Sequence, residues 1–321
     1  MNEPERYFYH SFPRRQRERS ANELDAGMKV LTSIAASGFL LTPEITEWRE
    51  PRDNGSLGKP WKVIQKKCCF TELTPGELAE HSEHFGKFSI EFDVRTFRQL
   101  GGIPVFYLPR ATDDDVGLES LAASLIARIG EIQILLNRLA DLAKLIESTE
   151  DKRRPLVIQK GEQQFHTRSS LGGAEDVIEM LTHDAQGVDI LRNALRALSA
   201  FFYPAEDFRY TGLLAYYRQR EWRFIANMAK HGHDLDRGLT DQEKDNLMAL
   251  DRDFFGRRID FFTGTYRRVD QCRLFSELEG KSLLQYARRI IVPADAIEAV
   301  SDLLGDSYHV PVVSLEELEC N

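Results

Sequence analysis

The chain has 321 residues, of which 42 are Lys or Arg and 51 are Asp or Glu, so its formal net charge is −9 at pH 7. This balance argues against broad electrostatic binding to nucleic acid, although a local basic patch would be compatible with it. With 42% hydrophobic residues, 21 Gly and 12 Pro, the composition excludes collagen-like and low-complexity chains and allows one large domain or two ordinary ones.

No run of the sequence approaches the roughly 18 consecutive apolar residues of a membrane span, so we expect no membrane insertion. Several arginines lie in the first twenty residues, but no apolar run follows them as it would in a signal peptide. The four cysteines, among them the neighbours Cys68 and Cys69, are too few for a disulfide scaffold and include no C-x-x-C pair. We therefore expect reduced thiols and a cytoplasmic protein.

The first 110 residues predict mixed strands and helices. Aromatic residues from Tyr7 to His10 indicate a strand, and apolar residues at helical spacing from Leu24 to Ile34 indicate a helix that Gly38 ends. Residues 42–62 carry several Pro and Gly and predict a loop. The remaining elements predicted here are strands at 68–70, 88–92 and 103–108, the last at a sheet edge because of Pro104, and a helix at 75–84 with a Thr74 and Glu77 capping box.

The pattern of apolar residues changes after Asp113-Asp114-Asp115, a run that we interpret as a solvated linker. Leucines and isoleucines from Leu118 to Leu145 recur at spacings of three and four and predict one long amphipathic helix. Such a helix could pack on the rest of the chain or join two copies through residues 115–150. Residues 159–174 predict a polar loop, and residues 175–202 predict further helices.

The last third returns to α+β character, with predicted strands at 221–225, 289–292 and 310–313, a helix at 293–304, and a loop with a short helix over 228–260. We therefore expect an α+β core formed by residues 1–110 and 206–321, interrupted by a helical insertion at 111–205.

Several kinds of site lack support in the sequence. G-x-S-x-G, G-x-x-x-x-G-K-[ST] and G-x-G-x-x-G are all absent. The run His231-Gly232-His233 followed by Asp234 could bind a metal, but it lies in a polar loop without a rigid frame, so we expect no metal site. His81 and His84 lie three residues apart without an evident third ligand.

A discontinuous set of residues remains, namely His10, Phe70, Phe85 and Glu221. Glu221 is the most informative, because Tyr217, Trp222 and Phe224 surround it with apolar bulk. A carboxylate in such surroundings either pairs with Arg218, Arg220 or Arg223, or is held ready for chemistry at a site. The sequence leaves both interpretations open.

Several short blocks occur in order along the chain, namely Tyr9-His10-Ser11-Phe12, Ser37-Gly38-Phe39, Cys69-Phe70-Thr71-Glu72-Leu73, His84-Phe85-Gly86, Arg220-Glu221-Trp222-Arg223 and Ile290-Ile291-Val292. These blocks resemble the AbiGi family of bacterial abortive phage resistance proteins, which are described as antitoxins. They fall within about residues 5–110 and 210–315, while the helical middle adds nothing to the resemblance. A cognate toxin or another defence protein is the partner that the resemblance implies.

The same residues are also similar to the ADP-ribosyltransferase core, which uses a His, aromatic and Glu set. That resemblance implies a mixed or antiparallel sheet and NAD as substrate. His10 would bind the NAD ribose, with Ser11 beside it. Phe70 would flank the nicotinamide pocket, Phe85 would take the stacking position, and Glu221 would be the catalytic carboxylate acting with His10.

Two hypotheses of function follow. In the first, the core transfers or hydrolyses ADP-ribose from NAD. In the second, the same core is a non-catalytic antitoxin or sensor that holds a partner toxin through the helical insertion. The net charge is compatible with both, and it would suit an inhibitor of a nucleic-acid-binding toxin.

Overall fold

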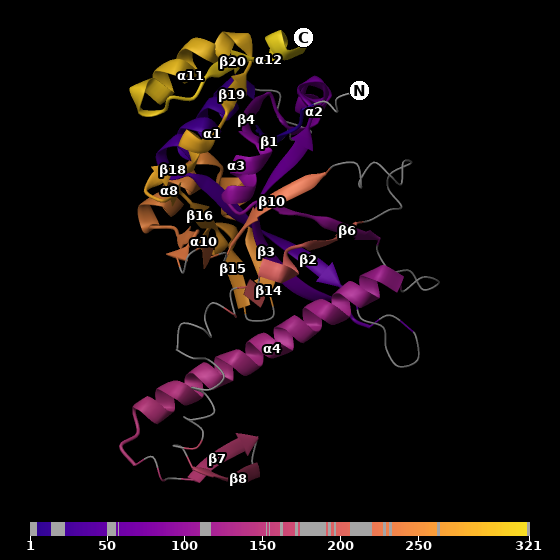
Figure 1. The fold of residues 1–321 in the computed structure, drawn as a ribbon, viewed down its shortest axis with the longest axis vertical. Helices are drawn as coiled ribbons and strands as arrows, with labels where there is room; N and C mark the ends of the chain where they lie inside the picture. The colour runs from indigo at the N-terminus through magenta and orange to yellow at the C-terminus, as the bar shows by residue number, and fades with distance from the viewer. Residues whose placement is uncertain are drawn as a thin grey trace.

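A computed structural model shows the architecture of the chain (Figure 1). It describes residues 5–13, 23–49, 56, 58–109, 117–151, 153, 155–160, 163–170, 173, 191, 194–195, 197–205, 220–226, 229–230, 233–261 and 264–319.

The elements follow one another as mixed strands and helices, with α4 as the longest. The N-terminal elements are β1 (Tyr7–Phe12), α1 (Glu23–Ser37), β2 (Phe39–Trp48), β3 (Trp61–Leu73), η1 (Pro75–Glu77), α2 (Leu78–Phe85), β4 (Phe88–Asp93), α3 (Val94–Gln99), β5 (Ile103–Pro104) and β6 (Phe106–Pro109). The middle elements are α4 (Gly117–Glu147), β7 (Pro155–Lys160), β8 (Gln163–Ser170) and β9 (Phe202–Ala205).

The C-terminal elements begin with β10 (Glu221–Ile225), β11 (Ala229–Lys230), β12 (His233–Asp234), β13 (Arg237–Gly238), α8 (Asp241–Leu250), α9 (Arg252–Phe255), β14 (Arg258–Phe261), β15 (Gly264–Arg267), α10 (Arg268–Gln271) and β16 (Arg273–Phe275). They continue with β17 (Glu277–Leu278), β18 (Lys281–Ser282), η3 (Leu283–Tyr286), β19 (Arg289–Val292), η4 (Ala294–Ala296), α11 (Ile297–Leu304), η5 (Gly305–Ser307), β20 (Val312–Ser314) and α12 (Leu315–Glu319).

The described strands form a ten-stranded sheet at the centre of the fold. Its order is β13-β16-β2-β3-β1-β4-β19-β20, and β10 joins β3 to β5. Within this sheet only β19 and β20 run parallel, and the other described pairs are antiparallel. The fold is therefore α+β with a mostly antiparallel sheet, as the sequence predicts.

The sheet forks at β3. The paired residues that locate the fork are Lys67 with Thr42 of β2 and Ile225 of β10, and Thr71 with Tyr9 of β1 and Glu221 of β10. Because a strand has only two edges, β1 and β2 must share one edge of β3, and β10 takes the other. On the shared edge, β2 pairs with β3 as far as Lys67 and β1 pairs with it from Thr71 on. Residues 68–70 of β3 therefore border a gap on this edge, where β1 and β2 diverge from each other.

The two faces of the sheet are covered differently. A large apolar cluster joins one face, including Phe8, Phe70 and Phe224, to α1, α3 and α11. On the other face, Tyr7 and Tyr9 pack with residues of α2 and α12. Further along that face, Ala122, Ala123 and Ile126 of α4 pack against Trp48, with Trp61, Leu108 and Phe202 around them. Alternation along each strand separates the two sets of side chains.

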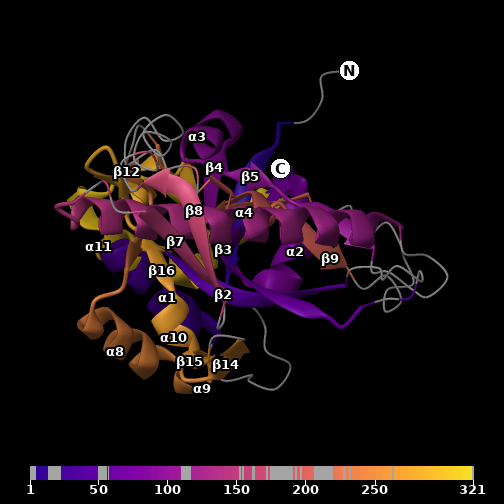
Figure 2. The same cartoon turned by 90° about the horizontal axis from the view of Figure 1, so that it is seen from below.

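The middle of the chain projects from this body. Figure 1 shows α4 crossing the lower end of the sheet and extending beyond it, with β7 and β8 past its C-terminal end. In the view from below, α8, α9, α10 and the β14–β15 pair gather at the side of the sheet opposite α3 (Figure 2). No helix in the described part of the chain is long and apolar enough to cross a membrane.

Several predicted local elements are confirmed. The capping box is present, with Pro75 at the first turn and Glu77 accepting a hydrogen bond from the Thr74 backbone N–H at 2.8 Å. Helix α1 ends at Gly38, whose φ of +94° favours glycine. Pro104 lies in β5, which pairs only with β10 among the described strands and so is an edge.

Other predictions were wrong because pairing between strands overrode local signals. Residues 42–62 are not a loop throughout, since β2 runs to Trp48. Pro43 is tolerated there because β16 pairs with β2 only as far as Leu41 among the described residues. The polar loop predicted at 159–174 contains β8, which pairs with β7.

The segment 111–205 is thus not purely helical. It contains the β7–β8 hairpin, and its last residues form β9, which runs parallel to β6. The predicted linker at 113–115 and most of the helices predicted over 175–202 lie outside the described residues.

Candidate functional site

A cavity of about 1190 Å³ occupies the fork, and its walls come from both faces of the sheet. On the side of β10, the lining side chains include Ser11, Lys67, Cys69, Phe85, Tyr107, Tyr203, Glu221 and Arg223. On the side of α1, they include His10, Phe12, Ser33, Phe39 and Cys68, and α8, α9 and α10 contribute Leu247, Phe254 and Arg268.

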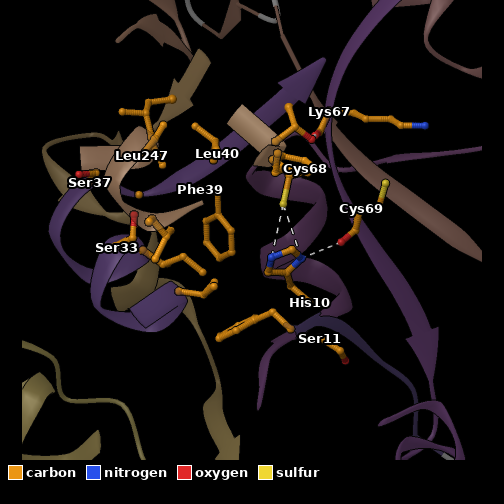
Figure 3. A pocket seen from close by; sticks show the side chains of 18 of the residues that line it. His10, Ser11, Ser33, Ser37, Phe39, Leu40, Lys67, Cys68, Cys69 and Leu247 are labelled. Carbon is orange, nitrogen blue, oxygen red and sulfur yellow. Dashed lines mark hydrogen bonds between the residues drawn. The ribbon is translucent and has the colours of Figure 1, made fainter. Parts of the chain in front are cut away.

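Alternation along β3 produces this two-sided arrangement. Figure 3 shows Cys68 pointing toward the ring of His10, whereas Lys67 and Cys69 point away from it. Glu221 and Arg223 of β10 lie opposite Thr71 and Cys69, so they share the face of Cys69. His10 and Glu221 therefore belong to opposite faces, and the gap between β1 and β2 lets both reach one cavity.

Glu221 accepts hydrogen bonds on both carboxylate oxygens. Arg223 Nε donates to Oε1 at 2.6 Å, and the hydroxyl of Tyr107 donates to Oε2. Burial alone would raise the pKa of Glu221, but the charges of Arg223 and Lys67 and these hydrogen bonds lower it below its usual value. Glu221 is therefore an ionised carboxylate with a second lone pair left on each oxygen.

Arg223 has almost no exposed surface and is fully enclosed by partners. Its Nη1 donates to Gln65 Oε1 at 3.2 Å, and its guanidinium lies 4.9 Å from the ring centroid of Tyr203. Gln65 in turn donates from Nε2 to the carbonyl oxygens of Ser199 and Phe202 at 2.9 and 3.0 Å. The end of the middle segment is thereby anchored on the sheet beside Glu221.

A second ion pair extends this group of charges. Lys67 Nζ lies 2.7 Å from Glu44 Oε2 and 4.3 Å from the ring centroid of Tyr203, whose hydroxyl donates to Glu44 Oε1 at 2.6 Å. Burial would raise the pKa of Glu44, but Lys67, Tyr203 and Arg223 lower it. Tyr203 therefore separates two buried cations, each of which has a carboxylate partner.

The residue before Glu221 has a strained backbone. Arg220 has a φ of +39°, which is uncommon outside glycine. Its guanidinium donates to Glu77 Oε1 at 2.8 Å, and its carbonyl accepts from the Glu72 N–H at 3.1 Å. These bonds hold the turn that starts β10 and so set the direction of Glu221.

His10 closes the fork from the apolar side. Its Nδ1 lies 2.9 Å from the carbonyl oxygen of Cys69, so Nδ1 carries the proton and donates it. Desolvation lowers the pKa of His10, and the Cys69 carbonyl opposes this only in part. The ring is therefore neutral at pH 7, and Nε2 is an acceptor that lies 3.8 Å from the Sγ of Cys68 (Figure 3).

The two predicted phenylalanines have different positions. Phe85 lines the cavity and stacks on His81, with ring centroids 4.3 Å apart. Phe70 is absent from the cavity wall and lies in the apolar core, where its ring contacts those of His10, Phe97 and Phe224. The structure thus brings His10, Ser11, Phe85 and Glu221 to one cavity and leaves Phe70 behind it.

The cysteines of the cavity wall are poor nucleophiles. Surrounding protein raises the pKa of the Cys69 thiol to about 12, and the charge of Glu221 adds to the rise. Burial also raises the pKa of the Cys68 thiol. Both side chains are therefore protonated at pH 7.

Metal binding finds no support in the part of the chain that the structure describes, where no group of three or more His, Cys, Asp or Glu could hold an ion. His233 begins β12, while His231 and Gly232 lie outside the described residues.

Sequence reasoning missed most of the partners of Glu221. Arg223 was foreseen as one of three alternative partners, but Lys67, Tyr107 and Tyr203 were not singled out. Polar residues at every second position of β3, from Gln65 to Thr71, were a signal of a polar sheet face. Tyr107 and Tyr203 lie on β6 and β9, which pair with each other but are far apart in the sequence. No local pattern in the sequence identifies them.

Comparison with known proteins places the chain in a family. A family model described as abortive phage resistance protein AbiGi, antitoxin, matches residues 61–252. The match covers more than half of the chain and includes the middle segment, so the expectation that this segment adds nothing to the resemblance is wrong. The blocks at residues 9–12, 37–39 and 290–292 lie outside the match. No curated protein and no solved structure matches the chain. The chain belongs to the AbiGi family of abortive phage resistance proteins.

Proposed function

We propose that this protein acts in abortive defence against phage and that its fork cavity binds NAD and cleaves the bond between nicotinamide and ribose. The proposal includes an ADP-ribosyltransferase-like core. One observation supports it above others: an ionised Glu221, an aromatic side chain from α2 and a neutral histidine line the same cavity.

The reaction needs a group that stabilises positive charge on the sugar. As the bond between the nicotinamide nitrogen and ribose C1′ breaks, nicotinamide leaves with the electron pair and the ribose gains oxocarbenium character. Water or a nucleophile of a target protein then bonds to C1′ and releases a proton. Glu221 accepts hydrogen bonds from the ribose hydroxyls on its remaining lone pairs and stabilises this charge.

The other site residues take supporting roles. His10 accepts a hydrogen bond from a sugar hydroxyl on Nε2, and Ser11, which shares a 2.8 Å hydrogen bond with Ser89, binds beside it. Phe85 provides an aromatic surface on the Glu221 side. Phe70 supports the ring of His10 from the core and positions it without touching NAD.

Exchange of Glu221 for Gln tests the enzymatic proposal, because it removes the charge and nearly keeps the volume. We expect NAD consumption, measured by chromatography of NAD and nicotinamide, to fall by about 100-fold or more. Asp25→Asn is the matched control, since Asp25 also lines the cavity but lies on α1, and it should change the rate little. A wild-type chain that consumes no NAD and labels no target, with defence unaffected by Glu221→Gln, would contradict the proposal.

A second function, toxin neutralisation, is favoured by the exposed face of α4. The large apolar residues Leu121, Leu125, Ile132 and Leu135 lie on one side of this helix and are 69%, 47%, 44% and 56% exposed. An apolar helix face of this kind can hold a partner helix or groove.

Leu121→Ser with Leu125→Ser tests the second function. If α4 binds a toxin, the double variant should lose both co-purification with the product of the neighbouring gene and neutralisation of its toxicity. Asp141→Ser is the control, because Asp141 is an exposed residue of the same helix whose spacing from Leu121 puts it on the opposite side of the helix. A wild-type chain that purifies alone and neutralises nothing would refute this function.

A further inference from the structure

One arginine in the cavity wall has no counter-ion among the residues that the structure describes. Arg268 begins α10, lines the cavity, and forms no ion pair with any residue that the structure describes. Its Nε is buried and has no hydrogen-bond acceptor in the same part of the chain. A buried donor on a cation without an acceptor is costly, so such a group is a candidate for binding an anion.

The side chain of Arg268 is held in a defined place. Its guanidinium carbon lies 4.2 Å from the ring centroid of Phe254, which also lines the cavity. Its backbone N–H donates to the carbonyl of Arg257 at 2.8 Å. Stacking on an aromatic ring occupies the face of a guanidinium and leaves its edge, which carries the N–H donors, available for binding.

The carboxylates of the cavity wall are directed elsewhere. Glu44 lies near enough to interact with the charge of Arg268, but its two oxygens bond Lys67 and Tyr203. Glu243 binds Arg237 and the Thr240 backbone.

Arg268 is a cation in spite of its burial. Burial lowers the pKa of Arg268 and the charge of Arg257, which does not line the cavity, lowers it further, yet a guanidinium stays protonated near neutral pH.

From this geometry we infer that Arg268 is an anion subsite of the fork cavity and binds a phosphate group of the ligand. A planar guanidinium edge matches two phosphate oxygens and donates two parallel hydrogen bonds to them. The inference deepens the proposed function and rests on it in one respect: the phosphate bound at Arg268 is the diphosphate of the nucleotide whose ribose meets Glu221. The cavity exceeds the roughly 300–1,000 Å³ of ordinary small-molecule pockets, so an extended ligand has room in it.

Titration calorimetry with inorganic pyrophosphate and with NAD tests the subsite. We expect Arg268→Gln to weaken binding of both ligands by about tenfold or more, the loss of one charge-assisted hydrogen-bonded contact. Arg268→Lys, which keeps the charge but loses the fork, should bind with intermediate affinity. Arg267→Gln is the matched control, since Arg267 is exposed and pairs with Asp270, and it should bind pyrophosphate as the wild type does.

Two results would overturn the subsite: no binding of pyrophosphate by the wild type at millimolar concentration, or equal binding by the wild type and a folded Arg268→Gln variant. Circular dichroism establishes that the variant is folded, and Arg268→Lys serves if it is not. NAD turnover by the wild type separates the two proposals. If the wild type consumes no NAD but its binding of pyrophosphate still depends on Arg268, the proposed reaction fails and the anion subsite stands.

Discussion

The two faces of the central sheet are built from the same strands but have opposite chemistry. On one face, Phe70 of β3 and Phe224 of β10 belong to a continuous aromatic core. On the other, Lys67 and Arg223 of the same two strands are buried and pair with Glu44 and Glu221. Burial of charge is costly even when the charges are paired, whereas burial of aromatic rings is favourable.

This difference teaches where to look for function. The aromatic face explains stability without further help, because its residues gain by leaving water. The charged face gains little over an apolar replacement, so its retention beside a cavity is better explained by a ligand than by folding. If this contrast holds, substitutions on the two faces should differ in their effects on the free energy of unfolding.

The aromatic face should carry the larger share of stability. Phe70→Ala removes a ring that is 1% exposed, and we expect a loss of about 3–5 kcal/mol in the free energy of unfolding. Urea denaturation measures it. Phe85→Ala, a change of the same chemistry on the cavity wall of the opposite face, should cost clearly less, and an equal cost would contradict the contrast.

The charged residues of the other face should be tolerated in the fold only when both partners of an ion pair are present. Arg223→Met leaves Glu221 without its ion-pair partner, and we expect about 3 kcal/mol of destabilisation from the uncompensated charge. Adding Glu221→Gln to Arg223→Met should recover part of that loss in the same urea assay, because the neutral amide needs no counter-ion. If the double variant is less stable than Arg223→Met, Glu221 stabilises the fold even without Arg223, and the contrast between the two faces fails.

Acid should weaken the cavity side of the sheet. Burial, with a contribution from His84, lowers the pKa of His81 from 6.5 to about 4. Between these two values the unfolded chain binds a proton that the folded chain does not, so the free energy of unfolding falls as the pH drops from 6.5 toward 4. His10 contributes in the same direction.

The buried carboxylate of Glu221 affects the free energy of unfolding at lower pH than the histidines do. Because the pKa of Glu221 is lowered in the fold, its stabilising effect is complete above its usual 4.5 and is lost as the pH falls through the lowered value. Thermal unfolding at pH 7.5 and pH 5 measures the histidine effect alone, and it should be smaller for His81→Gln than for the wild type. An unchanged pH dependence in His81→Gln would show that His81 is not the responsible group.

The exposed face of α4 should matter least for folding. Leu121→Ser alters a side chain that is 69% exposed, and we expect a change in the free energy of unfolding within about 0.5 kcal/mol. A large loss would mean that this face is buried against another part of the protein, which would count against its availability to a partner. Differential scanning calorimetry measures the change.

Local patterns in the sequence predicted the elements that depend on local interactions. The capping box at Thr74, the end of α1 at Gly38 and the long helix α4 are each specified by neighbouring residues and were predicted correctly. The pairing of β2 with β3 and of β7 with β8 overrode composition that favoured loops. Strand formation at those places depends on partners that a local pattern does not include.

The candidate site was partly predictable for the same reason. Ser11, His10, Phe85 and Glu221 were identified through a family resemblance, and all four line one cavity. Phe70 belongs to the opposite side of its strand, in the core. The wider charge network could not be found, because Glu44, Lys67, Tyr107 and Tyr203 come from four separate strands.

By itself, the sequence determined the acidic, mixed α+β character of this protein, its family, and the position of Glu221 in an aromatic strand. Only the tertiary structure decided that β1 and β2 share one edge of β3, and therefore that His10 and Glu221 meet in one cavity from opposite faces. The physical reason is that side-chain periodicity is a property of one segment, whereas the choice of a strand edge is a contact between segments far apart in the chain.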